Sequence, residues 1–195
     1  MRHAALATLV LALLPTAASA DVITLQPTPA DLYDLDHGRY YTWGFAPEFG
    51  EPDPVVIGAT LDFDNIRNWD SGRNWLHVHL LDAAPLGVTT YYDGERGGDN
   101  LAGLGLHLIT YENLPTTPQD ITYTFDADEL AALNDYLADD GIAGLGFDPD
   151  CHFYNDGVAL TLTYTNEVPE PACATLIGAG AAVMVVRRGR RMKRT

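Results

Sequence analysis

Two histidines, His77 and His79, alternate within the run NWLHVHLLD. Side chains two positions apart on a β-strand point to the same face, so we expect both imidazoles on one face. Two imidazoles at this spacing can bind a transition metal, and His107 in a later β-rich run offers a third ligand. The alternative is that both histidines hydrogen-bond to neighbouring side chains on a half-buried strand face. The sequence leaves both interpretations open.

A second group of ligand types lies in the loop GFDPDCHFYNDGV, which offers Asp148, Asp150, Asn155 and Asp156. Calcium takes about six to eight oxygen ligands and tolerates irregular loops, so a calcium site is one interpretation, although the spacing is not that of an EF-hand. The other is turn formation, in which Asp and Asn cap their own backbone. Two further loops carry similar residues: Asp93, Glu95, Asp99 and Asn100 in one, and Asp62, Asp64 and Asp70 in the other.

Nucleophilic catalysis finds little support in the sequence. Ser71 is the only serine after residue 20 and does not lie in a Gly-x-Ser-x-Gly turn. Cys151 is followed by His152, but side chains of adjacent residues point apart, and a thiol nucleophile needs a base beside it in space. Paired carboxylates for glycoside hydrolysis stay open, because the 27 acidic residues offer many pairs and no spacing selects one.

The N-terminus predicts export. Arg2 and His3 precede an apolar run over residues 4–14, and small residues follow up to Ala20. This order is typical of a secretory signal peptide, here residues 1–20, with cleavage by signal peptidase expected before Asp21. We therefore expect the rest of the chain to leave the cytoplasm.

Charge is distributed very unevenly along the chain. Residues 21–171 contain all 27 acidic residues but only four of the 11 basic ones. Such a negative field repels nucleic acid and anionic membrane surfaces, and it suits cations or neutral polymers as partners. Nucleic-acid binding is therefore excluded as a predicted function.

The C-terminus combines three features in order. Val168, Pro169, Glu170 and Pro171 come first, and an uncharged stretch over 172–186 follows. A basic end over 187–195 closes the chain and contains Arg187, Arg188, Arg190 and Arg191. The uncharged stretch is shorter than the roughly 20 residues that normally span a bilayer, and the arginines would stop it with the basic end in the cytoplasm.

This arrangement resembles the PEP-CTERM sorting signal. The resemblance covers residues 168–195 and implies that residues 168–171 are recognised by an exosortase, a membrane protease that removes the helix and passes the domain to the cell surface or extracellular matrix. Membrane association through residues 172–186 would then be transient. A permanent C-terminal anchor is the alternative. Residues 74–165 also look like a domain found in exported PEP-CTERM proteins without an established activity.

Between the two ends, residues 21–167 predict one domain. Short β-rich runs alternate with Gly, Asp, Asn and Pro clusters, a pattern that favours a mainly β fold, an antiparallel β-sandwich of jelly-roll-like type. Cys151 is the only cysteine there, so no disulfide within the domain is expected. The expected strands are 22–26, 39–45, 55–63, 75–81, 88–92, 102–111, 120–125, 142–147 and 158–165.

One segment predicts a helix instead. Leu130, Leu133 and Leu137 recur at helical spacing, Asp126 and Glu129 form a capping-box pattern, and Gly141 follows the helix. We expect this short helix to pack across one end of the sandwich.

These features together favour an exported, non-enzymatic structural or binding protein of the cell surface or matrix. Its expected partners during export are signal peptidase and an exosortase. The alternative is a calcium-supported carbohydrate-binding module, or a weak hydrolase, that acts on exopolysaccharide. Calcium is the cofactor that this alternative would require, and the transition-metal interpretation of His77 and His79 stands beside it.

Overall fold

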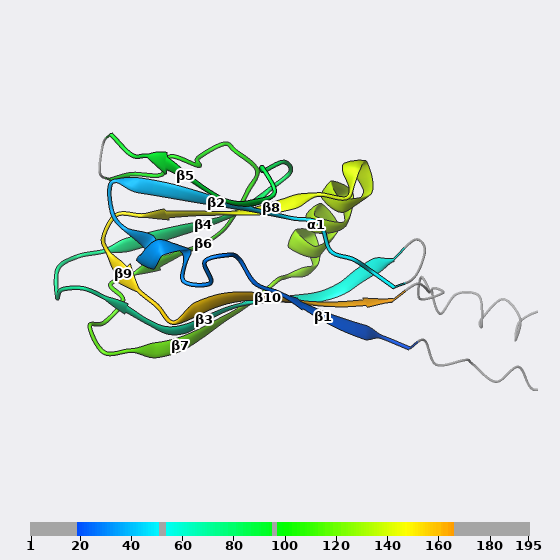
Figure 1. Ribbon diagram of the computed structural model, residues 1–195, viewed down its shortest axis with the longest axis horizontal. Helices are drawn as coiled ribbons and strands as arrows, with labels where there is room; N and C mark the ends of the chain where they lie inside the picture. Colours follow the sequence, from blue (N-terminus) through cyan, green and yellow to red (C-terminus); the bar gives the residue numbers. More distant parts are fainter. Residues whose placement is uncertain (1–18, 51–53, 95–96, 166–195) are drawn as a thin grey trace, which may run out of the picture.

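The computed structural model describes residues 19–50, 54–94 and 97–165. Within these ranges the protein is mainly β: two antiparallel five-stranded sheets pack face to face, with one α-helix (Figure 1). Residues 1–18 of the predicted signal peptide and the whole predicted sorting tail, including residues 168–171 and the arginine cluster, lie outside the described residues. No helix among the described residues has the length and hydropathy needed to cross a membrane.

Sheet 1 has the strand order β1-β10-β3-β7, and β9 pairs with the far end of β3. Its strands are β1 (Asp21–Leu25), β10 (Gly157–Thr165), β3 (Val55–Asn68), β7 (Gln119–Thr124) and β9 (Phe153–Tyr154). Sheet 2 has the order β5-β2-β8-β4-β6. Its strands are β5 (Gly87–Tyr92), β2 (Arg39–Phe45), β8 (Ala143–Pro149), β4 (Trp75–Leu81) and β6 (Leu106–Glu112).

The core lies between the sheets. Alternate residues of β2, β4 and β8 point inward and are almost fully buried against apolar side chains of β3 and β10. This alternation is the period of two that each strand imposes on its side chains. The opposite face of sheet 2 is therefore free to carry polar residues.

Helix α1 (Ala127–Asp140) begins and ends as the sequence predicts. The Asp126 side chain accepts hydrogen bonds from the backbone N–H groups of Asp128 and Glu129. The Glu129 carboxylate in turn accepts a hydrogen bond from the Asp126 N–H. Gly141 closes the helix in a left-handed conformation. The helix contacts β3 of one sheet and β4, β6 and β8 of the other, so it covers one end of the sandwich (Figure 1).

Four local features differ from the sequence-based expectation. Strand β3 continues past residue 63 to Asn68, because an irregularity between Phe63 and Ile66, with Asn65 at φ 51°, lets pairing resume. Strand β6 begins only at Leu106, since residues 102–105 form turns. The short strand β9 and the one-turn segment η1 (Leu32–Leu35) are not among the elements that the sequence predicts.

Candidate functional site

The outer face of sheet 2 carries most of the polar residues that the sequence singles out. On β4, Leu76, Val78 and Leu80 enter the core, which places His77 and His79 on the outer face. On β8 the same alternation places Asp148 there, and the register sets Asp148 opposite His77. His107 lies opposite His79 on β6. Three strands thus bring these residues to one surface.

Two loops cover part of this face because three outward positions are glycines. A Cβ on Gly44 would lie 2.3 Å from the Pro85 carbonyl oxygen, and one on Gly146 would lie 2.5 Å from a methyl group of Leu101. Gly144 meets Ala84 just as closely, at 2.6 Å. The absent side chains let loops 82–86 and 98–105 rest directly on the sheet.

The histidines are engaged by neighbouring polar groups. His77 Nδ1 and His107 Nε2 each lie 2.9 Å from the Thr110 hydroxyl, and His79 Nε2 lies 2.9 Å from the Asp99 carboxylate. Burial lowers the pKa of the His79 imidazole, while the Asp99 charge opposes that shift. His79 Nδ1 is buried without a hydrogen-bond partner.

The three histidines do not make a ready metal centre. Within the described ranges, the one group of His, Cys, Asp or Glu that brings three ligand atoms within 4.8 Å of one another consists of Asp36, His37 and His152. His77 and His79 therefore share a face but lack a third ligand atom at that distance. The arrangement favours the hydrogen-bonded interpretation of the pair.

Carboxylates gather beside the histidines. Asp148 and Asp93 are fully buried. Asp148 Oδ2 accepts hydrogen bonds from the backbone and side chain of Asn100, whereas its Oδ1 has no hydrogen-bond partner. Burial, together with the charges of Asp93 and Asp150, raises the pKa of Asp148 to about 6, although the Asn100 bonds oppose the shift. Burial raises the pKa of Asp150 too, and His77 opposes it.

The four expected calcium ligands are divided between the two sheets. Asp148 and Asp150 lie with Asp93 at sheet 2. Asn155 donates its side-chain amide to the Asp31 carbonyl at 2.8 Å, and Asp156 accepts from the Asn65 amide at 2.9 Å beside sheet 1. The chain turns from β8 through β9 to β10 over these few residues. Side chains that are close in sequence therefore contact different parts of the fold. The four side chains therefore have different hydrogen-bond partners, and the calcium hypothesis stays a prediction.

A groove with a cavity volume of about 450 Å³ lies between sheet 2 and loops 82–86 and 98–105. The rings of Tyr40 and Tyr91, on the adjacent strands β2 and β5, stack with centroids 4.8 Å apart and planes 11° apart, and both line the groove. Thr42, Asp82 and Leu104 also line the groove, and Asp82 adds a carboxylate. The Thr42 hydroxyl is buried without a hydrogen-bond partner. The sequence shows the aromatic residues but not their convergence.

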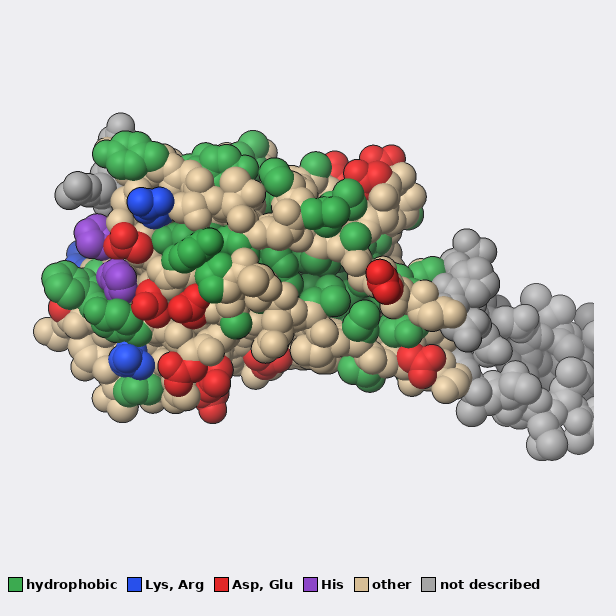
Figure 2. Space-filling view, in the orientation of Figure 1, with side chains coloured by type: hydrophobic (Ala, Val, Ile, Leu, Met, Phe, Trp, Pro, Cys, Tyr) green, Lys and Arg blue, Asp and Glu red, His purple; other side chains and the backbone are tan. Residues whose placement is uncertain are grey.

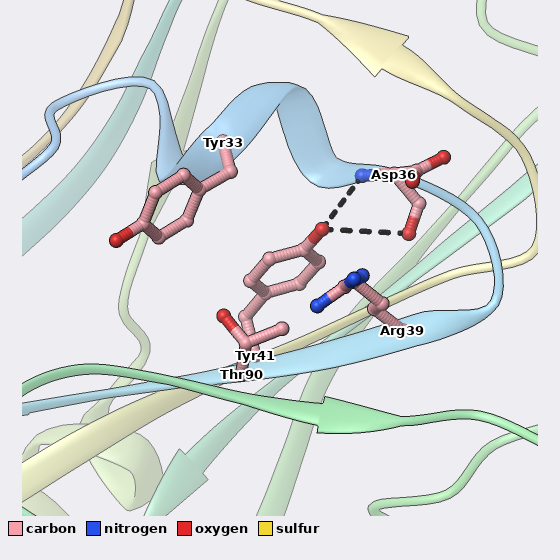
Figure 3. A pocket seen from close by; sticks show the side chains of 5 residues that line it. All are labelled: Tyr33, Asp36, Arg39, Tyr41 and Thr90. Carbon is pink, nitrogen blue, oxygen red and sulfur yellow. Dashed lines mark hydrogen bonds between the residues drawn. The ribbon is translucent and has the colours of Figure 1, made fainter.

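A second cavity of about 460 Å³ opens near η1 (Figure 3). It is lined by Tyr33, Asp36, Arg39, Tyr41 and Thr90. The backbone N–H of Asp36 donates to the Tyr41 hydroxyl at 2.9 Å. Burial raises the pKa of Tyr41, so this phenol stays protonated at neutral pH.

The adjacent Cys151 and His152 point to different partners. Trp69 Nε1 donates to Cys151 Sγ at 3.2 Å, while His152 Nδ1 lies 3.1 Å from the Asp36 carboxylate. The thiol therefore contacts an indole and not the neighbouring imidazole.

Comparison of the sequence with protein-family models and with curated proteins gives no match.

Proposed function

We propose that this chain is an exported protein of the cell surface or extracellular matrix whose domain binds extracellular polysaccharide and does not catalyse a reaction. The observation that carries the binding part is the groove on sheet 2, where Tyr40 and Tyr91 line a cavity of about 450 Å³. Aromatic rings offer a large apolar area at little conformational cost, which suits the apolar faces of sugar rings. Polar groups at the same groove suit sugar hydroxyls.

The net charge supports a neutral polymer as the ligand. Acidic residues outnumber basic ones by 27 to 11 over the full chain, and most of the basic residues lie in the predicted tail. A negative domain repels anionic chains, so neutral glycans are favoured over acidic ones.

The order of the strands supports a jelly-roll-like topology. Strands β1, β10, β3 and β7 face strands β2, β8, β4 and β6, and β5 extends the second sheet beyond β2. Jelly rolls of about eight strands include many lectin domains. This is a likeness of architecture, which many unrelated functions share, so the groove remains the main argument.

Export and sorting follow from the two ends of the sequence. Residues 1–20 predict a signal peptide, and residues 168–195 resemble the PEP-CTERM signal, which implies an exosortase as a processing partner. The precursor would be held in the membrane through residues 172–186 until the tail is removed. Intact-mass measurement of the exported protein tests this step: loss of residues 172–195 supports sorting, and retention of the full tail contradicts it.

Retention of the full chain on immobilised neutral polysaccharides tests the binding proposal. We expect Tyr91→Ala to weaken retention about tenfold, which corresponds to about 1.4 kcal/mol. Tyr92→Ala is the matched control, because Tyr92 follows Tyr91 on β5, is 78% exposed and does not line the groove. Equal retention of both variants and the unmodified chain contradicts the proposal.

A release assay separates binding from hydrolysis. We expect no sugar to be released during incubation with the same polysaccharides. Release that one carboxylate substitution abolishes would instead identify a glycoside hydrolase.

A further inference from the structure

Asp36, His37 and His152 converge at the end of the sandwich near η1 and β9. His152 Nδ1 lies 3.1 Å and His37 Nδ1 lies 3.4 Å from the same oxygen, Oδ1 of Asp36. One ligand atom from each of the three residues lies within 4.8 Å of the others. Figure 2 shows histidine side chains beside acidic ones close to this end of the molecule.

We propose that Asp36, His37 and His152 bind a transition metal ion of the zinc type. Zinc–nitrogen bonds of about 2.0–2.1 Å and zinc–oxygen bonds of about 2.0–2.2 Å place neighbouring ligands of a tetrahedral ion about 3.3–3.5 Å apart. The two nitrogen–oxygen distances, 3.1 and 3.4 Å, are close to that separation. Two imidazoles and a carboxylate also form a ligand set that zinc, copper and nickel accept.

The backbone that presents Asp36 adopts an unusual conformation. Residues Leu32–Leu35 all have positive φ values, between 40° and 57°, so η1 is a left-handed turn without glycine. Left-handed backbone costs about 1–2 kcal/mol per non-glycine residue, and such conformations cluster at functional sites. Leu32 and Leu35 are fully buried, which holds the turn in place. The turn places Asp36 beside His152, which follows it by 116 positions.

His152 is held from several sides. Its backbone carbonyl accepts from the Trp69 N–H at 3.0 Å, and its ring lies against that of Tyr154, with centroids 4.6 Å apart. Its Nε2 is buried without a hydrogen-bond partner. Nδ1 is the ring nitrogen that faces the Asp36 carboxylate. These contacts hold the ring in that orientation before any ion binds.

Three protein ligands leave a tetrahedral ion one free position. The side chains of His37 and Asp36 are 43% and 45% exposed, so water or a small ligand can reach the site from solvent. The backbone of Asp36 also contacts Tyr41 in the neighbouring cavity (Figure 3). This cavity is distinct from the groove on sheet 2. The metal site therefore stands independently of polysaccharide binding.

Titration of the metal-free full chain with Zn²⁺ by calorimetry, and with Co²⁺ by visible absorption, tests the site. We expect about one ion per chain and the intense visible bands of four-coordinate Co²⁺. His37→Ala should weaken binding at least tenfold; this side chain is 43% exposed, so its removal should leave the fold intact. His107→Ala is the matched control, because His107 contacts Thr110 on the outer face of sheet 2.

Asp36→Asn separates metal binding from a hydrogen-bonded cluster. The amide oxygen can still accept from His152, but it lacks the charge that favours a cation, so the fold should persist while affinity falls. Absence of Zn²⁺ and Co²⁺ binding by the unmodified chain overturns the proposal. So does a His37→Ala variant that binds as tightly as the His107→Ala control, whether or not Asp36→Asn folds.

Discussion

The carboxylate of Asp148 on β8 accepts two hydrogen bonds from Asn100, one from its backbone N–H at 2.5 Å and one from its side-chain amide at 3.1 Å. The pair ties loop 98–105 to the outer face of sheet 2, where Leu101 of the same loop lies over Gly146. Because Asp148 is fully buried near two other carboxylates, this tether carries an electrostatic cost at neutral pH.

That cost predicts a pH dependence of stability. The pKa of Asp148 is about 6 in the folded protein, against an ordinary value of 3.8, so the native state binds more protons than the unfolded state between these values. The free energy of unfolding therefore falls as pH rises through this window, by up to about 3 kcal/mol at about 1.4 kcal/mol per pKa unit. Urea denaturation with EDTA at pH 4.5 and 7.5 measures the effect.

Asp148→Asn isolates the contribution of this one carboxyl. The variant cannot ionise, so its stability relative to the unmodified chain should be higher at pH 7.5 than at pH 4.5 by about 2 kcal/mol. An equal difference at the two pH values contradicts the assignment.

Millimolar calcium in place of EDTA tests the calcium hypothesis at Asp148 and Asp150. A rise in Tm that Asp148→Asn abolishes supports the hypothesis, and an unchanged Tm opposes it.

Gly44→Ala should destabilise the protein by about 1–3 kcal/mol, the usual cost of overpacking. The added Cβ would lie 2.3 Å from the Pro85 carbonyl oxygen, so loop 82–86 must move away from the sheet. Gly58→Ala is the control in β3, because the nearest atom there lies 3.6 Å away. Urea denaturation of the two variants compares them; a Gly44→Ala variant as stable as Gly58→Ala would show that the loop yields without cost.

Asp126→Ala tests the helix start. The substitution removes the acceptor of two N–H groups at the first turn of α1, so a loss of about 1 kcal/mol is expected. Asp135→Ala, at an exposed position in the middle of the same helix, supplies a control with the same change of charge. If the two variants lose equal stability, charge and not capping determines the effect.

The sequence predicts best where local chemistry decides the structure. Strands 39–45 and 75–81 have the predicted bounds because period-two alternation marks them, and the capping box marks the start of α1. The Asp36–His152 contact joins residues 116 positions apart, which no local pattern encodes. The calcium hypothesis at residues 148–156 stays a prediction: Asp148 accepts from Asn100 and Asp156 accepts from Asn65, and these separate partners could not be read from proximity in sequence.

The left-handed turn η1 permits a prediction that depends on backbone geometry alone. Asp34 has φ 57°, a region that glycine enters freely and a β-branched residue enters at high cost. Asp34→Gly should therefore keep or raise the free energy of unfolding, by up to about 1 kcal/mol, because the gain in the folded state exceeds the added entropy of the unfolded chain. Asp34→Val should lower it by at least about 1 kcal/mol. Both changes remove the same charge, so their difference reports the backbone. Guanidinium denaturation of both variants measures that difference, and equal stabilities would contradict a left-handed conformation at residue 34.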